Sequence, residues 1–469
     1  MPQPYPQQQA YGQPVYPQQP YANQGAYAQQ PYIPQPPAGY AQPYYPQAPA
    51  AQAAPANGGT YAPSQASAAN SQTLGVAEEL AQVNREQTST VSGGIIFRNR
   101  AGENGLSDLT DIEAPVQGRI QAGNGHIVIT ATPVTLDAGT ADNLGTTLSR
   151  FGSGAAGTAT EYGSQTANGV GLSLGYESTR LDGDIGVTPV GFRENTYVGG
   201  LQYNGSVTDK VSYSLAVARR AVTDSLLSYA GAHDQLEGLE WGGVTSSGAL
   251  ASLAWDDGTS GLYTNAEYQY YEGHNVASNT AIKGGGGVYT RLLKDADQTL
   301  TIGLNTTIMG YNRNLSYFTY GQGGYFSPQQ YVILNLPVEW TGRNGVFTYD
   351  VKGSIGVQHY RQDASDYFPL GDNTSAALRS ALITAGTAPD SGAIYPAQSK
   401  TGVAYSFSAV GEYQLAPQLA VGATASLGNA YQYREWLGAV YVRYSFTKQA
   451  GLQPFPPTPL TSPYVSLSN

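Results

Sequence analysis

Residues 436–446 read WLGAVYVRYSF, a stretch that alternates between two kinds of side chain at every step. Its even positions are aromatic or aliphatic apart from Gly438, whereas its odd positions include Tyr441, Arg443 and Ser445. Successive side chains of a β-strand point to opposite faces. The stretch is therefore predicted to be a strand with one face in an apolar medium and the other in a polar one.

The same two-residue period returns along the chain from about residue 92. Apolar side chains alternate with small or polar ones at 170–177, 211–218, 262–270, 332–340 and 419–427. We count about 16 strand candidates between residues 92 and 446. Their polar positions are mostly Ser, Gly, Thr, Asn and Glu, and their apolar positions include aromatics near the strand ends. This combination is typical of a membrane β-barrel with aromatic girdles facing lipid and a polar lumen.

The connections between these candidates favour a membrane barrel over a soluble β-sandwich. Short turns are expected at 122–125, 178–180, 205–209, 256–260, 294–298, 341–345 and 415–417. Long connections are expected at 137–168, 220–247, 312–330 and 358–400. Short and long connections alternate, as periplasmic turns and outer loops do in outer-membrane barrels. The sequence thus predicts an all-β, about 16-stranded antiparallel transmembrane barrel in the bacterial outer membrane, with both termini on the periplasmic side.

Composition excludes several other classes of protein. The chain has 469 residues, a formal net charge of −11 and no cysteine, and 12% of its residues are charged. Without cysteine there is no disulfide framework and no thiolate metal site. The acidic balance argues against a nucleic-acid partner. No uninterrupted apolar run approaches the roughly 18 residues that a membrane-spanning helix needs.

The chain divides into four predicted regions. Residues 1–73 form a Pro/Gln/Ala/Tyr-rich tract without charged residues, which we expect to be a disordered linker or, alternatively, an adhesive segment that recruits partners. A short helix and lead-in are expected over 74–91, the barrel over 92–446, and a Pro-rich tail over 447–469. The start of the chain lacks the basic and apolar regions of a signal peptide, so we expect the chain to be part of a longer or split protein.

Two glycine motifs that could indicate catalysis or cofactor binding have plainer explanations. Gly171–Gly175 fits the Gly-x-Ser-x-Gly nucleophile pattern around Ser173, but it lies inside an alternating strand. Gly152–Gly157 fits a dinucleotide-binding pattern but follows no buried strand. The four histidines lie too far apart in the sequence to suggest a metal site. We therefore expect no metal and no cofactor.

Alternation assigns a set of polar side chains to the face that lines the lumen. These candidates are Glu177, Asn265, Glu267, Asn335, Glu339, Asp350, Lys352, Glu412 and Arg443. They are expected either to hold a wet interior together through ion pairs or to form a hydrophilic track for a passing solute, and the two roles are compatible.

The segment 317–331 is the richest in aromatics, and glycines separate its rings. Aromatic faces pack against the C–H faces of sugars, so a gating or glycan-contacting loop is one interpretation, and an interfacial girdle with a turn is the other. The candidate contact residues are Tyr317, Phe318, Tyr320, Tyr325 and Phe326.

This segment resembles the aromatic loop in the C-terminal barrel of the bacterial cellulose synthase operon protein C family. Segments 102–111, 132–139 and 184–192 resemble the same family in the same order. The resemblance implies a channel that exports nascent cellulose, a β-1,4-glucan, with no catalytic residues. It also implies as partners outer-membrane lipid, an inner-membrane cellulose synthase and a periplasmic tetratricopeptide-repeat region that this chain lacks.

Other functions stay open at this point. The barrel could export another exopolysaccharide, such as poly-N-acetylglucosamine or alginate, or act as a sugar porin. An outer-membrane hydrolase would need a site around a residue such as Ser173 or Glu267. A surface adhesin would bind through its loops and conduct no ions.

Overall fold

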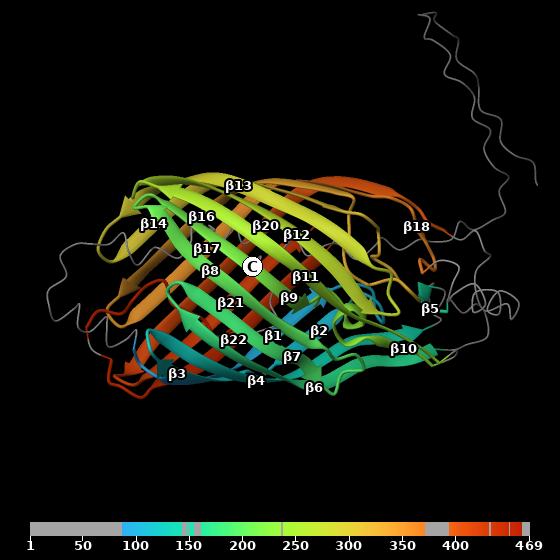
Figure 1. Cartoon of the computed structure of the whole chain (residues 1–469), viewed down its shortest axis with the longest axis horizontal. Helices are drawn as coiled ribbons and strands as arrows, with labels where there is room; N and C mark the ends of the chain where they lie inside the picture. Colours follow the sequence, from blue (N-terminus) through green and yellow to red (C-terminus); the bar gives the residue numbers. More distant parts are fainter. Residues whose placement is uncertain are drawn as a thin grey trace, which may run out of the picture. The chain divides into compact units, whose positions relative to one another are not determined.

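The computed structural model describes residues 87–142, 147, 150–153, 161–235, 238–370, 394–430, 433–449 and 451–461. The predicted linker over 1–73 and residues 74–86 of the predicted helix and lead-in over 74–91 lie outside the described residues, and β1 begins at Thr90, two residues before the predicted barrel start. Figure 1 shows long strands that wrap into a barrel. The wall consists of β1 (Thr90–Ala101), β2 (Leu109–Glu113), β3 (Val116–Ala122), β4 (Gly125–Asp142), β6 (Glu161–Ser178), β7 (Leu181–Val190), β8 (Tyr197–Thr208), β9 (Val211–Ala221), β11 (Leu239–Asp256), β12 (Ser260–His274), β13 (Asn279–Lys294), β14 (Gln298–Tyr311), β16 (Gln330–Asn344), β17 (Phe347–Gln362), β20 (Gln398–Ala416), β21 (Leu419–Ala430) and β22 (Tyr433–Ser445).

The wall is antiparallel throughout and closes on itself. The main sheet has 18 strands, but β2 and β3 share one position beside β4, and β10 (Ala232–Asp234) only extends the edge of β11. Sixteen positions are left in the barrel, as the sequence predicted. The first and last strands pair from Thr90↔Ser445 to Ala101↔Arg434, so no sheet edge faces the membrane. Among the described residues, no helix is long and apolar enough to cross a membrane.

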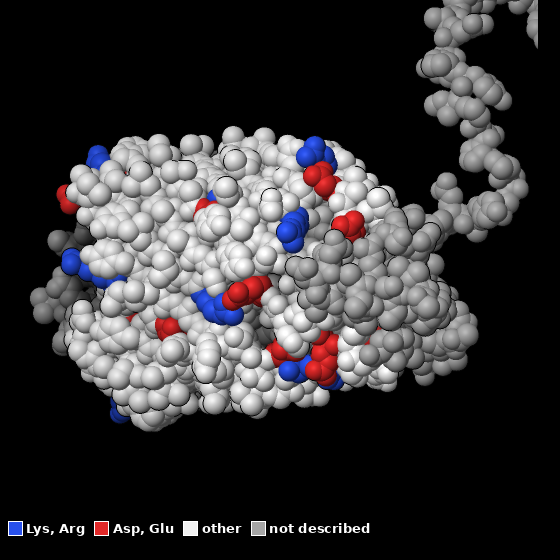
Figure 2. Space-filling view, turned by 45° about the vertical axis from the view of Figure 1, so that its right-hand side comes forward, with Lys and Arg blue, Asp and Glu red and all other residues white. Residues whose placement is uncertain are grey.

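The two-residue period separates an outer apolar face from an inner polar face. On β16, Leu334 and Leu336 are 52% and 55% exposed, whereas Asn335 between them is 2% exposed. Exposed aromatics, among them Trp340 and Phe446, lie on the outer face near the strand ends, where a lipid interface needs them. In Figure 2, uncharged residues predominate on the face shown, and most acidic and basic atoms lie next to each other.

Pro115 explains a break that the sequence analysis did not foresee. Proline has no N–H to donate to a strand ladder. The second wall position is accordingly split at Ala114–Pro115 into β2 and β3, and β1 pairs with both halves. Pro115 still accepts a hydrogen bond from the backbone N–H of Gly94, at 3.2 Å.

The turns and loops follow the predicted arrangement with two differences. Tight connections join the strands at the end where β1 starts and β22 finishes, although those after β8 and β16 fall about three residues later than expected. The opposite end is not uniformly long-looped, since the connections 191–196, 275–278 and 431–432 are short. Many strands also have 14 to 19 residues, more than spanning requires, so the wall extends beyond the apolar band.

The long-loop end carries the remaining elements and the main apolar core. These elements are α2 (Leu226–Ala230), β10, the parallel pair β5 (Phe151–Gly152) and β15 (Phe318–Thr319), and the pair β18 (Ser365–Asp366) and β19 (Ile394–Tyr395). Their buried side chains form one large cluster around Trp241 and a second around Tyr229. The two largest buried apolar clusters therefore lie at the long-loop end.

Candidate functional site

The five predicted acidic residues of the lumen all form ion pairs across the inner wall. Lys352 Nζ lies 3.0 Å from Glu339 Oε1 and 3.2 Å from Asp350 Oδ2, so one ammonium serves two carboxylates. Arg443 Nη1 donates to Glu412 Oε2 at 2.8 Å, and Tyr441 donates to the same oxygen. These groups come from the adjacent strands β16, β17 and β20 and from β22, which is separated from β20 by β21.

The partners of the other two carboxylates were not among the sequence candidates. Glu267 lies directly opposite Lys283 in the β12–β13 register, and their charged atoms are 3.6 Å apart. Glu177 lies 2.9 Å from Arg119. Lys283 is on the strand next to Glu267, and Arg119 is on β3, which β4 separates from Glu177 on β6. Such charges identify partners only once the order and register of the strands are known.

The two predicted asparagines lie on the inner face without an ionic partner. Asn335 is opposite Asn305, which accepts a hydrogen bond from the Tyr263 hydroxyl at 3.0 Å. The Asn335 Oδ1 atom is buried and has no hydrogen-bond partner among the described residues. Asn265 lies two positions beyond Tyr263 on the same face of β12. This part of the wall offers amide and hydroxyl groups without net charge.

The loop over 312–329, which we call the plug, is buried at the long-loop end of the barrel. The five aromatics that the sequence singled out are all buried there, together with Leu315. Those aromatics are Tyr317, Phe318, Tyr320, Tyr325 and Phe326. Of the two interpretations left open, an interfacial girdle does not match the burial, because a girdle side chain faces lipid.

Phe326 is the plug residue that contacts the inner wall of β16 and β17. Its ring packs edge-to-face against Tyr360 and Tyr331, with ring centroids 5.3 and 6.3 Å apart. Ile333 and Ala404 belong to the same buried cluster. The plug thus makes an apolar contact with a wall that is otherwise polar.

The loop between β9 and β11 fastens one side of the plug. The Phe326 N–H donates to Asp224 Oδ2 at 3.1 Å, and the Ser225 hydroxyl donates to the Gly324 carbonyl at 2.7 Å. Ser225 also caps α2, where it forms a capping box with Ser228. Gly324 has a φ of +65°, and a Cβ there would approach Leu227 and the Ser225 hydroxyl, so this contact requires glycine.

The loop between β17 and β20 fastens the opposite side. Gln322 Nε2 donates to the Ser365 hydroxyl at 3.0 Å and to the Asp366 carbonyl at 2.7 Å. Gln362 Nε2 donates to the Ser316 hydroxyl at 2.7 Å. A third loop contributes β5, which pairs in parallel with β15 of the plug. The plug is therefore held by loops from three distant parts of the sequence.

The pKa values of several titratable groups shift in opposite directions at the two ends of the barrel. Burial raises the pKa of the Asp224 carboxyl above its ordinary value, although the Arg100 guanidinium, 3.7 Å away, acts in the opposite direction. Burial also raises the pKa of Tyr317 to about 12, so its hydroxyl stays protonated. In the exposed turns of the other end, backbone N–H donors lower the pKa of Asp257 and of Asp295.

The segment 451–461 returns to the inner face of the wall near the short-turn end. Arg343 Nη1 donates to the Gln453 carbonyl at 3.1 Å, and its guanidinium lies 5.5 Å from the centre of the Phe455 ring. Arg443 donates to the Thr458 carbonyl. Leu460 is 6% exposed and lies over Gly94 of β1, where a Cβ would come within 3.2 Å of it. The sequence analysis treated this segment only as a Pro-rich tail.

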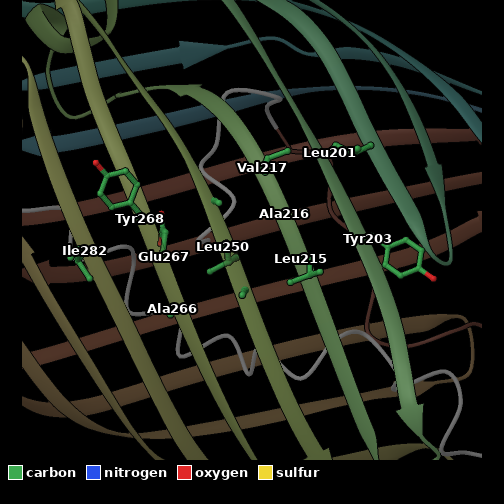
Figure 3. Close-up of a pocket in the computed structure, with 12 residues that line it drawn as sticks. Leu201, Tyr203, Leu215, Ala216, Val217, Leu250, Ala266, Glu267, Tyr268 and Ile282 are labelled. Carbon is green, nitrogen blue, oxygen red and sulfur yellow. The ribbon is translucent and has the colours of Figure 1, made fainter.

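A separate hollow of about 680 Å³ lies on the wall formed by β8, β9, β11, β12 and β13 (Figure 3). Its lining includes Leu201, Leu215, Tyr268 and Ile282, which are all exposed on the lipid-facing side. The hollow therefore belongs to the membrane surface. No group of three or more His, Cys, Asp or Glu side chains could hold a metal among the described residues. Ser173 lies inside β6 and not on a strand-to-helix turn.

Comparison with known proteins places this barrel in a family. A family model described as the C-terminus of cellulose synthase operon protein C matches residues 107–447. The chain belongs to the cellulose synthase operon protein C family. It is the C-terminal, outer-membrane barrel of such a protein, because the matched residues span the wall from the β1–β2 loop to the end of β22.

Curated members of the cellulose synthase operon protein C family are much longer than this chain. The protein of that name from Pseudomonas fluorescens (strain SBW25) is 38% identical over 407 residues, which cover 86% of this chain and 30% of the relative. The protein of that name from Xanthomonas axonopodis pv. citri (strain 306) is 30% identical, and the match covers 86% of this chain and 36% of the relative. The chain thus spans about a third of these relatives. Among solved structures, a bacterial polysaccharide outer-membrane secretin matches with a TM-score of 0.47 at 10% identity, covering 77% of this chain and 99% of that one.

Proposed function

We propose that the chain is an outer-membrane conduit that exports a neutral polysaccharide, and specifically cellulose, from the periplasm to the exterior. The observation that carries this proposal is the ion-paired inner wall, in which each of the five candidate carboxylates has a cationic partner. The names of the relatives, all cellulose synthase operon proteins, support cellulose as the polymer.

Charge compensation favours a neutral polymer over a charged one. A polyuronate such as alginate gains most from unpaired cations along its path, and a partly deacetylated glucosamine polymer gains most from unpaired carboxylates. A wall of paired charges, asparagines and small residues gives a neutral glucan weak hydrogen bonds with no dominant binding site. Conduction requires such weak contacts, because tight sites would stall the chain.

The proposed role needs partners beyond this chain. A polymer has to be synthesised and pushed into the barrel, so we propose an inner-membrane cellulose synthase as the source and the periplasmic repeat region of the longer relatives as the connection between them. The barrel lies in outer-membrane lipid. We propose no catalytic role for it, because transport through the lumen breaks and forms no covalent bond.

The plug provides the gate in this proposal. It occupies the exterior end of the barrel, so a polymer leaves only when the plug moves. The predicted contact residues Tyr317, Phe318, Tyr320, Tyr325 and Phe326 are the rings that such a movement would bring into contact with the glucan.

Planar-bilayer recordings of the full chain test the proposal. Cellohexaose, a chitin oligomer and an alginate oligomer are added in turn to the periplasmic side while open-channel events are recorded. Brief blocks by cellohexaose that are absent with alginate support a conduit for neutral glucan. Equal block by the chitin oligomer would leave polysaccharide export but refute selectivity for cellulose. An open current that no glycan alters would refute the conduit and favour a general porin.

A further inference from the structure

Three tyrosine rings form a stack between the plug and the loop after β17. The Tyr395 ring lies between those of Tyr317 and Tyr367, with ring centroids 3.6 and 4.2 Å apart and interplanar angles of 6° and 7°. Tyr395 is 1% exposed, and the outer two rings are also buried. The stack unites residues from three separate segments, of which Tyr317 comes from the plug and Tyr395 from β19.

The geometry of this stack is not the one that aromatic rings prefer. Ring quadrupoles favour offset or edge-to-face pairs with centroids about 4.5–7 Å apart, and they disfavour direct face-to-face overlap. Both contacts of Tyr395 are shorter than this range and nearly parallel. The outer rings thus present two electron-rich faces to a third electron-rich face.

A pyranose ring complements these two faces better than a third tyrosine does. The outer rings lie no more than about 8 Å apart, and optimal carbon–carbon contact is about 3.5–4.0 Å, so the slot accommodates one ring. In a β-1,4-linked glucose residue the axial C–H bonds point to both faces and the hydroxyls lie around the edge. Its partly positive C–H hydrogens therefore meet the negative faces of the tyrosines.

Polar side chains of the plug bond to the segment that carries Tyr367. Gln322 is fully buried, and its amide nitrogen is used by Ser365 and Asp366, the residues that precede Tyr367. Its Oε1 atom has no hydrogen-bond partner among the described residues. The Thr319 hydroxyl donates to the Tyr367 carbonyl and lies 3.3 Å from the Tyr395 hydroxyl, so its oxygen could accept from a sugar hydroxyl in place of Tyr395. An unpaired buried acceptor is costly, and a ligand hydroxyl would remove that cost.

We propose that Tyr317 and Tyr367 form a sugar clamp for one glucose ring of a β-1,4-glucan, and that the Tyr395 ring occupies the clamp in the closed state. This inference rests on the proposed export function and adds to it a defined binding position at the exterior end. The exported polymer displaces Tyr395, so the clamp is shut when no polymer is present.

Binding of cellohexaose to the full chain, refolded in detergent and followed by isothermal titration calorimetry, tests the clamp. Tyr395→Ala empties the slot and is expected to tighten binding on the order of tenfold, the scale on which stacking against an aromatic face contributes. Tyr395→Leu is measured in parallel, so that the result does not depend on one variant folding. Tyr395→Phe keeps the ring and is expected to bind as the unaltered chain does. Adding Tyr317→Ala to Tyr395→Ala removes one face and should abolish the gain.

Two controls separate the clamp from a general loosening of the loops at this end of the barrel. Phe192→Ala removes a buried aromatic that packs against Tyr229, outside both the plug and the stack, so an equal gain in affinity in this variant would overturn the proposal. The affinity for maltohexaose, whose α-linked rings do not form a flat ribbon, should increase little in the Tyr395 variants. An increase equal to that for cellohexaose would refute the β-1,4-glucan class. The clamp is also refuted if neither Tyr395→Ala nor Tyr395→Leu binds cellohexaose more tightly while both variants show the heat-modifiable gel mobility of a folded barrel. Channel block of the unaltered chain by cellohexaose would persist in that case, so the export proposal would stand.

Discussion

Truncation of Phe326 to alanine should shift the plug toward an open position while leaving the wall intact. Phe326 is 4% exposed and packs edge-to-face against Tyr331 and Tyr360. Removing a buried phenylalanine costs about 3–5 kcal/mol, and the lower value corresponds to a shift of about 100-fold in an equilibrium constant. The backbone N–H that bonds Asp224 is kept in the variant, so the expected loss comes from the ring alone.

Single-channel recording measures this shift directly. If the plug gates the barrel, Phe326→Ala should raise the open probability by about 100-fold at a fixed voltage, up to saturation. Phe347→Ala is the matched control, because Phe347 faces the lipid side of the wall and touches no plug residue among its ring contacts. An unchanged open probability in a folded Phe326→Ala barrel would refute the assignment of the plug as the gate.

Three other predictions concern charges and the terminal segment. Lys352→Gln leaves two lumen carboxylates unpaired and should increase cation selectivity, whereas Glu412→Gln leaves a lumen arginine unpaired and should decrease it. Reversal potentials in a salt gradient measure both changes, and shifts of the same sign would contradict the ion-paired lumen. Burial raises the pKa of Asp224 in the closed plug, so the closed state binds the proton more tightly than the open state does. The closed plug should therefore gain stability as pH falls through the raised pKa toward 3.8 and lose it as pH rises. Asp224→Asn should flatten the pH dependence of the open probability. Arg343→Ala removes the hydrogen bond and ring contact that hold the terminal segment, and should speed protease cleavage near Phe455, while an unchanged rate would show that other contacts hold it.

The wall was predictable because its signal is local. A two-residue alternation needs no knowledge of neighbours, so the outer and inner sides of strands such as β16 and β22 followed from their own residues. The pairing of Glu267 with Lys283 was not predictable in the same way, since it depends on register between two strands. Pro115 carried a readable signal for a break in a strand, which the alternation analysis did not use.

The burial of the plug and the docking of the terminal segment on the wall could not be predicted from local sequence. Phe318 pairs with Phe151 in the β15–β5 register and shares a buried cluster with it, and the Phe326 N–H bonds to Asp224; both partners are far away in the sequence. Aromatic and glycine content alone describes a girdle and a plug equally well. The terminal segment is bound largely through backbone carbonyls, such as that of Gln453, and any sequence offers those acceptors.

The way the plug is held suggests why the polymer itself would open it. Its hydrogen bonds to neighbouring loops, such as those of Gln322, exchange for bonds to water on opening, at a net cost of only about 1 kcal/mol each. The buried aromatic faces have no such replacement in water, so they hold the closed state. A glucan supplies C–H faces to rings such as Tyr317, and a ligand that binds one state better shifts the population toward it. On the proposed function, water and ions alone would leave the barrel closed, and the arriving polymer would offset the cost of exposing the rings.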